Sequence, residues 1–303
     1  MCGIVGLFLK QDEHLDRLGE WFTPMIAKMG GRGLDSAGVA FYVDPLPLDR
    51  HRVSLRHSDL DVDWSGLVKS ADASGWSLSE PISVVRDHAM FEIPAAESSG
   101  FVLWLSGAHP DVQPMGYGQR MQIFKGVGGP SELIEGTGIR GLRGTHAIGH
   151  TRMATESAVL FEGCHPFSTG PDLCLVHNGS LSNHNRLRDW LGRQGIHCAS
   201  ENDSEVAAAY LTWQLASGTE LREALTAALD DLDGFYTFAI GTEDGFAVLR
   251  DRIGCKPAVM AETDAYVAIA SEYRALAHLP GADDAEVFEP KPGRVYVWER
   301  ERV

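Results

Sequence analysis

The spacing of hydrophobic residues predicts a strand at the start of the chain and a helix directly after it. Residues 4–9 are mostly β-forming side chains, which is typical of a strand. Over residues 14–29 hydrophobic side chains recur every three or four positions, the spacing of a helix with one buried face, although Pro24 interrupts it. The same reasoning predicts further helical segments at 129–138, 203–216 and 219–231.

Short hydrophobic runs bounded by turn residues predict strands over most of the remaining chain. In the last third they follow one another through short turns, which is typical of antiparallel sheets. Because the helices are grouped rather than alternating with the strands, the pattern favours an α+β fold over a doubly wound parallel sheet. The expected strands are 82–93, 101–105, 121–127, 173–176, 236–241, 246–250, 258–261, 266–271 and 294–299.

Residues 44–81 differ from the rest of the chain because they lack a clear hydrophobic period. They are rich in Asp, Ser, Gly and Pro. We therefore expect an irregular insertion at about 44–81, within a single domain that spans residues 1–303.

Composition and charge narrow the class of partner. The 303 residues are 44% hydrophobic and 22% charged, which is ordinary for a globular protein. A formal charge of -16 leaves no basic surface for phosphates, so we expect neither nucleic acid nor an anionic membrane as partner. The sequence contains no signal peptide and no hydrophobic run long enough to span a bilayer, which predicts a cytoplasmic protein.

The cysteines and histidines do not indicate a metal site. Five cysteines without a close pair argue against disulfides and against a thiolate-bound metal. His146 and His150 have a helical ligand spacing, but their segment is expected to be a strand, where such residues lie about 13 Å apart. We expect no metal.

The second residue of the chain offers the most specific chemistry. Removal of the initiator Met would leave Cys2 with a thiol and a free α-amine on one residue. An α-amine titrates near about 7.7 to 8.0, so it can accept the proton of the thiol directly or through one water. The alternative is a small buried cysteine in the first strand, and these residues alone do not decide between the two.

Three other segments carry polar residues that have both a functional and a structural interpretation. A glycine-rich turn at 29–38 indicates either a close backbone approach or a plain connection. Asn178 and Gly179 follow a strand, where Asn-Gly is a strong hairpin signal. Asp203 opens a predicted helix, where Asn202 and Glu205 could form a capping box and Asp203 could simply complement the helix dipole.

Nine short motifs occur in a characteristic order behind the N-terminal cysteine. Together they resemble the class II glutamine amidotransferases of the N-terminal-nucleophile hydrolase superfamily, with a match from Cys2 to about Val297. The motifs are Cys-Gly-Ile-Val-Gly at 2–6, Arg-Gly-x-Asp-Ser-x-Gly at 32–38, Gly-His-Thr-Arg-x-Ala-Thr at 149–155, His-Pro-Phe at 165–167, His-Asn-Gly at 177–179, Asp-Ser-Glu-Val at 203–206, Arg-Asp-x-x-Gly-x-Lys-Pro at 250–257, Ala-Ser-Glu at 270–272 and Pro-Gly-Arg-Val at 292–295.

The resemblance implies a four-layer αββα sandwich of two antiparallel sheets and a role for each matched residue. Cys2 would attack the side-chain amide of glutamine, and its α-amine would pass the proton to the leaving ammonia. The implied catalytic residues are Cys2, Arg32, Gly33, Asn178 and Gly179, the last two forming the oxyanion hole. The implied substrate-binding residues are Arg152 for the α-carboxylate, Asp203 for the α-ammonium, and Thr155 in the same pocket.

The resemblance also implies that such a chain works together with other subunits. The family usually fuses this domain to one that consumes the ammonia, and the sequence leaves no room for it. We therefore expect a glutaminase-type subunit in a hetero-oligomer with synthase subunits, similar to the amidotransferase subunit of N-methylglutamate synthase or to glutamate synthase. Any flavin or iron–sulfur cluster would then belong to partner subunits, and this chain would bind no cofactor. The alternatives are an amidohydrolase for another small amide and a non-catalytic subunit that senses glutamine or glutamate.

Overall fold

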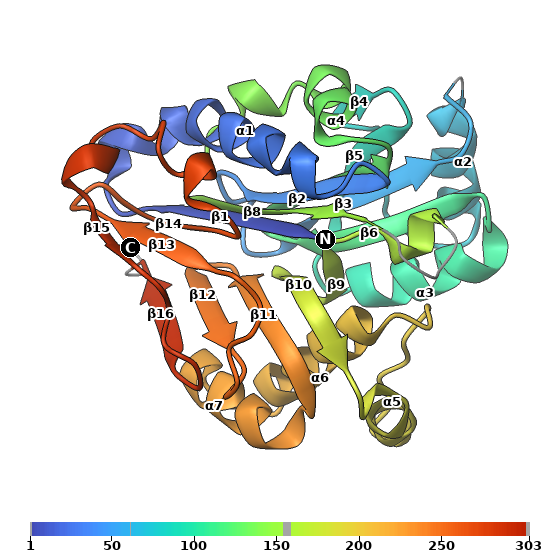
Figure 1. The fold of residues 1–303 in the computed structure, drawn as a ribbon. Helices are drawn as coiled ribbons and strands as arrows, with labels where there is room; N and C mark the ends of the chain where they lie inside the picture. Colours follow the sequence, from blue (N-terminus) through green and yellow to red (C-terminus); the bar gives the residue numbers. More distant parts are fainter. Residues whose placement is uncertain (1, 61, 154–158, 301–303) are drawn as a thin grey trace.

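Stacked layers of helices and sheets make up the molecule, as the computed structural model shows for residues 2–60, 62–153 and 159–300 (Figure 1). Helices α1 (Leu18–Lys28) and α4 (Pro130–Thr137) cover the outer side of one large sheet. Helices α5 (His184–Arg193), α6 (Asp203–Ala216) and α7 (Leu221–Asp231) cover the outer side of the other. Two antiparallel sheets between two helical layers confirm the expected α+β sandwich.

The first large sheet contains the N-terminal strand near its centre. Strand β1 (Gly3–Leu9) lies between β14 (Tyr266–Ala270) and β8 (His146–Arg152), and all its residues are buried. The seven strands are antiparallel, in the spatial order β15 (Glu286–Phe288), β13 (Val259–Glu262), β14, β1, β8, β2 (Ser36–Tyr42) and β7 (Met121–Val127).

The second large sheet faces the first across a continuous hydrophobic layer. That layer includes Ile4, Phe8 and Ile148 from the first sheet and Val176 and Val248 from the second. The five strands of the second sheet lie in the order β16 (Val295–Glu299), β12 (Gly245–Arg250), β11 (Gly234–Gly241), β10 (Leu173–Leu181) and β9 (Phe167–Gly170), again antiparallel.

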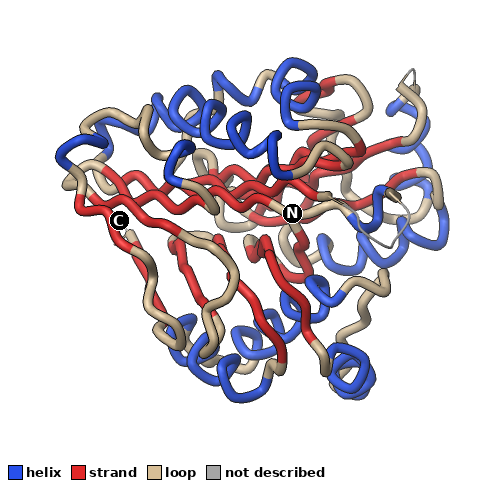
Figure 2. Tube along the Cα trace, viewed as in Figure 1, coloured by secondary structure: helices blue, strands red, loops and turns tan. Residues whose placement is uncertain are grey.

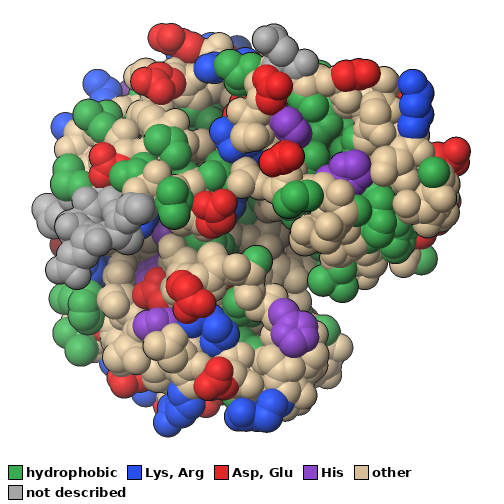
Figure 3. Space-filling model, turned by 90° about the vertical axis from the view of Figure 1, so that its right-hand side faces the viewer, with side chains coloured by type: hydrophobic (Ala, Val, Ile, Leu, Met, Phe, Trp, Pro, Cys, Tyr) green, Lys and Arg blue, Asp and Glu red, His purple; other side chains and the backbone are tan. Residues whose placement is uncertain are grey.

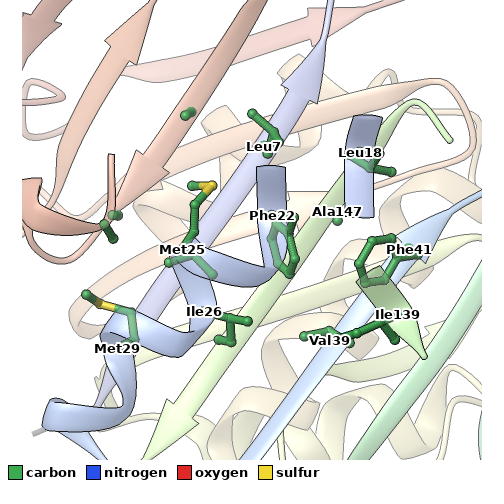
Figure 4. Close-up of a cluster of buried hydrophobic side chains, with 14 of the residues drawn as sticks. Leu7, Leu18, Phe22, Met25, Ile26, Met29, Val39, Phe41, Ile139 and Ala147 are labelled. Atoms are coloured by element: carbon green, nitrogen blue, oxygen red, sulfur yellow. The ribbon is translucent and has the colours of Figure 1, made fainter. Parts of the chain in front are cut away.

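Helix α1 packs on the first sheet through the hydrophobic face that the sequence predicts. Phe22, Met25 and Ile26 are fully buried and face Leu7 and Val39 of the sheet (Figure 4). The α-helix begins at Leu18, later than expected, because residues 12–17 form a 3₁₀ segment.

The segment at 44–81 is not irregular, contrary to the expectation. It contains strand β3 (Arg50–His57) and helix α2 (Trp64–Ala73), which belong to a third sheet. This sheet has the order β4 (Ser83–Val85), β5 (His88–Pro94), β3 and β6 (Val112–Gly118), and its helices α2 and α3 (Ser98–Ala108) are coloured blue in Figure 2. The third sheet and its helices enclose a separate hydrophobic core, which explains why this segment has regular secondary structure.

The strand expected at 101–105 is also wrong, because these residues lie in α3. Phe101 and Leu105 are fully buried, whereas Leu103 between them is 73% exposed. The two inward residues are one helical turn apart, so a helix buries them on one face. The strand expected at 82–93 is a hairpin of β4 and β5, and α5 was not expected at all.

The third sheet adds a cleft to one side of the sandwich. A cavity of about 410 Å³ lies where α3 and β6 face β9 and the residues before α6, and Figure 3 shows this side of the molecule hollowed. Within the described ranges, none of the helices combines the length and the hydrophobicity that crossing a bilayer requires.

Candidate active site

The beginning of β1 brings Cys2 to a place where both large sheets meet. Gly3 pairs with Thr151 at the end of β8, and Ser36 at the start of β2 pairs with Arg152. Close packing requires Gly3, because a Cβ there would lie 2.8 Å from Thr151 Oγ1 and 2.9 Å from Met29 Cβ. The first strand is therefore fixed up to its first residue, and Cys2 is partly exposed just before it.

Two of the predicted catalytic residues hold Cys2 through its backbone. Arg32 Nε donates to the carbonyl oxygen of Cys2 at 2.9 Å, and Asn178 Nδ2 donates to the same oxygen at 3.3 Å. Arg32 is only 7% exposed, and its Nη1 donates to Glu272 Oε1 at 2.7 Å. Buried charge needs such pairing, and the bond from Arg32 lowers the pKa of the Glu272 carboxyl. Cys2, Arg32 and Asn178 thus form one hydrogen-bonded group.

Gly33 and Arg152 touch through their backbones. A Cβ on Gly33 would lie 2.4 Å from the carbonyl carbon of Arg152, so the turn can approach β8 only with glycine at this position. The guanidinium of Arg152 extends toward Gly163, where a Cβ would lie 3.0 Å from Nη1. The structure therefore places Arg152 directly beside the turn that carries Arg32.

Asn178 and Gly179 lie inside strand β10, so the hairpin interpretation is wrong. Ser182 donates its backbone N–H to Asp233 on the β11 side, whereas Leu181 donates its N–H to Asp203 on the opposite side. Because N–H groups alternate along a strand, the N–H of Gly179 points to the same side as that of Leu181, away from β11.

Asp203 does more than complement the dipole of α6. Its Oδ2 accepts the backbone N–H of Leu181 at 2.8 Å, two residues beyond Gly179. Asn202 caps the helix by accepting the N–H of Ser204 at 2.9 Å. The expected capping box is incomplete, because Glu205 instead accepts the backbone N–H groups of Ala199 and Ser200. The carboxylate of Asp203 thus joins the helix to the strand that carries Asn178.

Comparisons with known proteins show the family to which the chain belongs. The family model described as "Glutamine amidotransferase domain" matches residues 150–278. The chain is 49% identical over 302 residues to the glutamine amidotransferase-like protein GlxB of Rhizobium meliloti (strain 1021), covering 100% of this chain and 99% of that protein. The chain belongs to the class II glutamine amidotransferase family.

Two other known proteins share part of the sequence or the fold. The amidophosphoribosyltransferase of Methanocaldococcus jannaschii is 30% identical over 186 residues, which cover 59% of this chain and 40% of that protein. The solved glutamine phosphoribosylpyrophosphate amidotransferase from B. subtilis superimposes with a TM-score of 0.62 at 19% identity. That match covers 98% of this chain and 47% of the other, and shows a common fold.

A buried group of histidines lies behind the candidate site. His165 Nε2 and His177 Nδ1 both lie 2.9 Å from Ser204 Oγ, and the rings of His165 and His150 stack at 4.0 Å. Burial lowers the pKa of His150 to about 3 and that of His177 to about 4, and it lowers the pKa of His165 well below its usual value. All three imidazoles are therefore neutral near pH 7.

The structure adds residues to which the sequence analysis gave no role. Glu272 pairs with Arg32, and the neighbouring Ser271 accepts the N–H of Ile4 at 2.9 Å. Ser204 joins two histidines. The Ala-Ser-Glu and Asp-Ser-Glu motifs contain these residues, so the motifs were the available signal, but the partners of the residues are distant in sequence.

Two further predictions from the sequence concern Thr155 and metal binding. Thr155 lies outside the described residues, so its expected place in the substrate pocket stays a prediction. Among residues 2–60, 62–153 and 159–300, His, Cys, Asp and Glu side chains form no group of three or more that could hold a metal ion.

Proposed function

We propose that this amidotransferase hydrolyses the side-chain amide of glutamine through Cys2 and delivers the ammonia to a partner subunit. The observation that carries the proposal is the arrangement around Cys2: Arg32 and Asn178 both hold its carbonyl, and Gly179 is adjacent to Asn178 in β10. A merely buried cysteine would not require two side-chain donors from distant segments at its backbone.

Catalysis would begin after removal of Met1, when the α-amine of Cys2 accepts the thiol proton. The thiolate attacks the amide carbon of glutamine, and the C–N bond then breaks as the amine returns a proton to the leaving nitrogen, giving ammonia and a γ-glutamyl thioester. Water hydrolyses the thioester to glutamate and restores the thiol. Each step needs only the terminal residue and water as proton carriers.

The oxyanion formed during attack needs donors that the site contains. Asn178 Nδ2 carries two protons and donates only one to Cys2, so the second remains for the oxyanion. The N–H of Gly179, which points away from β11, would supply the other donor. Loss of one such donor typically lowers kcat about a hundred- to a thousandfold.

Arg152 and Asp203 would hold the two charged ends of glutamine. A guanidinium can bind the α-carboxylate with two parallel hydrogen bonds, and a carboxylate is the natural partner of the α-ammonium. Thr155 would line the same pocket. Their presence favours a free amino acid over another small amide.

The partner would be a synthase subunit of a glutamate synthase-like or N-methylglutamate synthase complex. Support comes from the sequence resemblance, and the chain aligns with GlxB over 99% of the length of that protein. Flavin and iron–sulfur cofactors would lie on those partners.

A labelling and activity experiment tests the proposal. Glutamine hydrolysis is measured for the purified chain, alone and with the proteins that copurify from its native cells, beside Cys2→Ala. A glutamine analogue with an electrophilic side-chain end, 6-diazo-5-oxo-norleucine, should label Cys2 only. Cys255 is exposed and serves as the internal control for simple accessibility. We expect loss of activity in Cys2→Ala and a rise of at least about tenfold with partners, since a partner that favours the active conformation shifts its population.

The outcomes separate the alternatives. Hydrolysis of other amides but not of glutamine would indicate an amidohydrolase. Glutamine binding by both wild type and Cys2→Ala without hydrolysis would indicate a sensor. Full activity in protein that retains Met1 would contradict the proposed mechanism.

A further inference from the structure

Ser204 lies at the centre of a buried hydrogen-bonded group that includes Asp203. Its Oγ is 2.9 Å from His165 Nε2, 2.9 Å from His177 Nδ1 and 3.3 Å from Asp203 Oδ1. We propose that Ser204, supported by His165 and His177, is a positioning residue that orients Asp203 toward the α-ammonium of the substrate. The inference rests on the proposed glutaminase function.

The number of protons in this group determines which atom donates. The Ser204 hydroxyl has one proton, and the ionised carboxylate of Asp203 can only accept. If the hydroxyl donated to either histidine, that ring would carry its proton on the opposite nitrogen, His165 Nδ1 or His177 Nε2. Neither of these nitrogens has a hydrogen-bond partner among the described residues, and a buried N–H without an acceptor is rarer than a buried acceptor without a donor.

The consistent assignment therefore has both histidines donating to Ser204 Oγ and the hydroxyl donating to Asp203 Oδ1. The positions of these hydrogens are assigned from the hydrogen-bond partners of each nitrogen and oxygen. In this arrangement each imidazole is held as one neutral tautomer. Because both histidines donate to Ser204 Oγ, the hydroxyl proton of Ser204 is left to point at the carboxylate of Asp203.

Burial makes this arrangement rigid. Ser204 is 1% exposed, His177 3% and His165 6%, whereas the side chain of Asp203 remains 21% exposed. Asp203 is thus the only member of this Ser204-centred group that reaches accessible space. The three supporting residues come from different elements: α6, β10 and the segment before β9.

Two bonds fix the plane of the Asp203 carboxylate. Leu181 N–H donates to Oδ2 at 2.8 Å, and Ser204 donates to Oδ1. Each carboxylate oxygen has two acceptor positions, so one on each oxygen remains for the substrate ammonium. His177 Nδ1 is 3.7 Å from Oδ1, so a neutral ring matters there, because a cationic one would compete with that ammonium.

The test compares ligands that differ only in the α-ammonium. In wild type and in Ser204→Ala, KM and kcat are measured for glutamine, and inhibition constants are measured for L-glutamate and for glutarate, which lacks the amine. We expect Ser204→Ala to raise KM for glutamine and the inhibition constant of glutamate at least about fivefold, because a hydrogen bond to a charged group is lost. The inhibition constant of glutarate should change less than about twofold, because glutarate has no amine for Asp203 to bind. The value of kcat should also change less than about twofold, because it depends on the groups around Cys2.

Three variants control for general damage. Ser204→Thr retains the hydroxyl and should restore most of the affinity for glutamate. Ser54→Ala removes another fully buried hydroxyl, one in β3 of the third sheet that accepts the N–H of Ile123 in β7, and should leave all constants unchanged. Asp203→Asn should weaken glutamate more than Ser204→Ala does and leave glutarate unaffected.

Equal weakening of glutamate and glutarate in Ser204→Ala, or failure of Ser204→Thr to restore the difference, would overturn the inference. If Ser204→Ala does not fold, the comparison of Ser204→Thr with Ser204→Cys, a weaker donor, gives the same readout. An inactive wild type would instead refute the proposed function, so the two failures are distinguishable.

Discussion

Arg152 and Asn178 come from different sheets, and they should affect different kinetic constants. Arg152 ends β8, whereas Asn178 lies in β10 and donates to the Cys2 carbonyl. Arg152→Ala should raise KM for glutamine at least about tenfold, because one charged hydrogen bond is worth roughly 1.5 to 3 kcal/mol. Asn178→Ala should instead lower kcat about a hundredfold or more with little change in KM, because its donor faces charge that develops in the transition state.

Steady-state kinetics of the two variants checks this division. Arg252→Ala is the matched control, because this exposed arginine pairs with Asp230 on α7 and lies outside the candidate site. Its kinetic constants should equal those of wild type. Unchanged KM in Arg152→Ala would mean that Arg152 is a structural residue at the end of β8.

At this scale the sequence analysis predicted site residues from local motifs. Cys2, Arg32 and Asn178 were all chosen from motifs, and the structure brings them into contact. Glu272 and Ser204 received no role, because their importance lies in partners: Glu272 pairs with Arg32, 240 residues away. Such pairing is a property of the fold and leaves no local pattern.

Among the elements, the pattern succeeded where a helix cap or turn residues mark the ends of a hydrophobic run. Helix α6 and strand β7 have the predicted bounds, 203–216 and 121–127. It failed at α3, where five successive large residues give no period and the third sheet selects Phe101 and Leu105 as the buried face. It also failed at 44–81, where β3 is half-buried and its partners β5 and β6 come later in the chain.

Asp172 is one of the residues that connect the third sheet to the sandwich. Asp172, in the turn between β9 and β10, is 5% exposed and accepts the backbone N–H groups of Gln119, Arg120 and Met121 at 2.6 to 2.9 Å. These residues connect β6 of the third sheet to β7 of the first. Asp172→Ala would leave three N–H groups without this acceptor.

We expect Asp172→Ala to lower the free energy of unfolding by about 2 to 4 kcal/mol, since each buried donor left unpaired costs about 1 to 3 kcal/mol before relaxation. Urea denaturation monitored by circular dichroism measures the change. Asp283→Ala removes an exposed aspartate and should stay within about 0.5 kcal/mol of wild type. Equal midpoints for the two variants would show that the turn connection does not contribute to stability.

Considered as a whole, the molecule buries several histidines whose pKa is lowered by burial. His146 is stacked on Tyr42 at 3.9 Å, His165 and His177 contact Ser204, and His150 stacks on His165. Burial lowers the pKa of His146 to about 3, as it does for His150, and lowers that of His177 to about 4. Sequence alone could not predict this, because the four residues become buried only when both sheets and α6 are assembled.

The lowered pKa values of these histidines predict how the free energy of unfolding depends on pH. Unfolded histidine titrates near 6.5, so between about pH 6.5 and 4 the unfolded state binds protons that the native state does not. The free energy of unfolding must therefore rise with pH through this window and level off above about pH 7. One such histidine contributes up to about 1.4 kcal/mol per pH unit.

Urea midpoints measured at pH 7.5, 6, 5 and 4.5 test the whole-molecule prediction, and His146→Phe isolates one histidine. Phenylalanine keeps an aromatic ring against Tyr42 and does not titrate, although it loses the bond between Thr145 Oγ1 and His146 Nδ1. The variant should therefore be less stable than wild type at pH 7.5, where the lost hydrogen bond dominates. Its stability should fall less steeply on acidification, by up to about 1.4 kcal/mol per pH unit, because one proton-binding site of the unfolded state has been removed. A variant whose pH slope equals that of wild type would show that His146 is not held neutral in the native state.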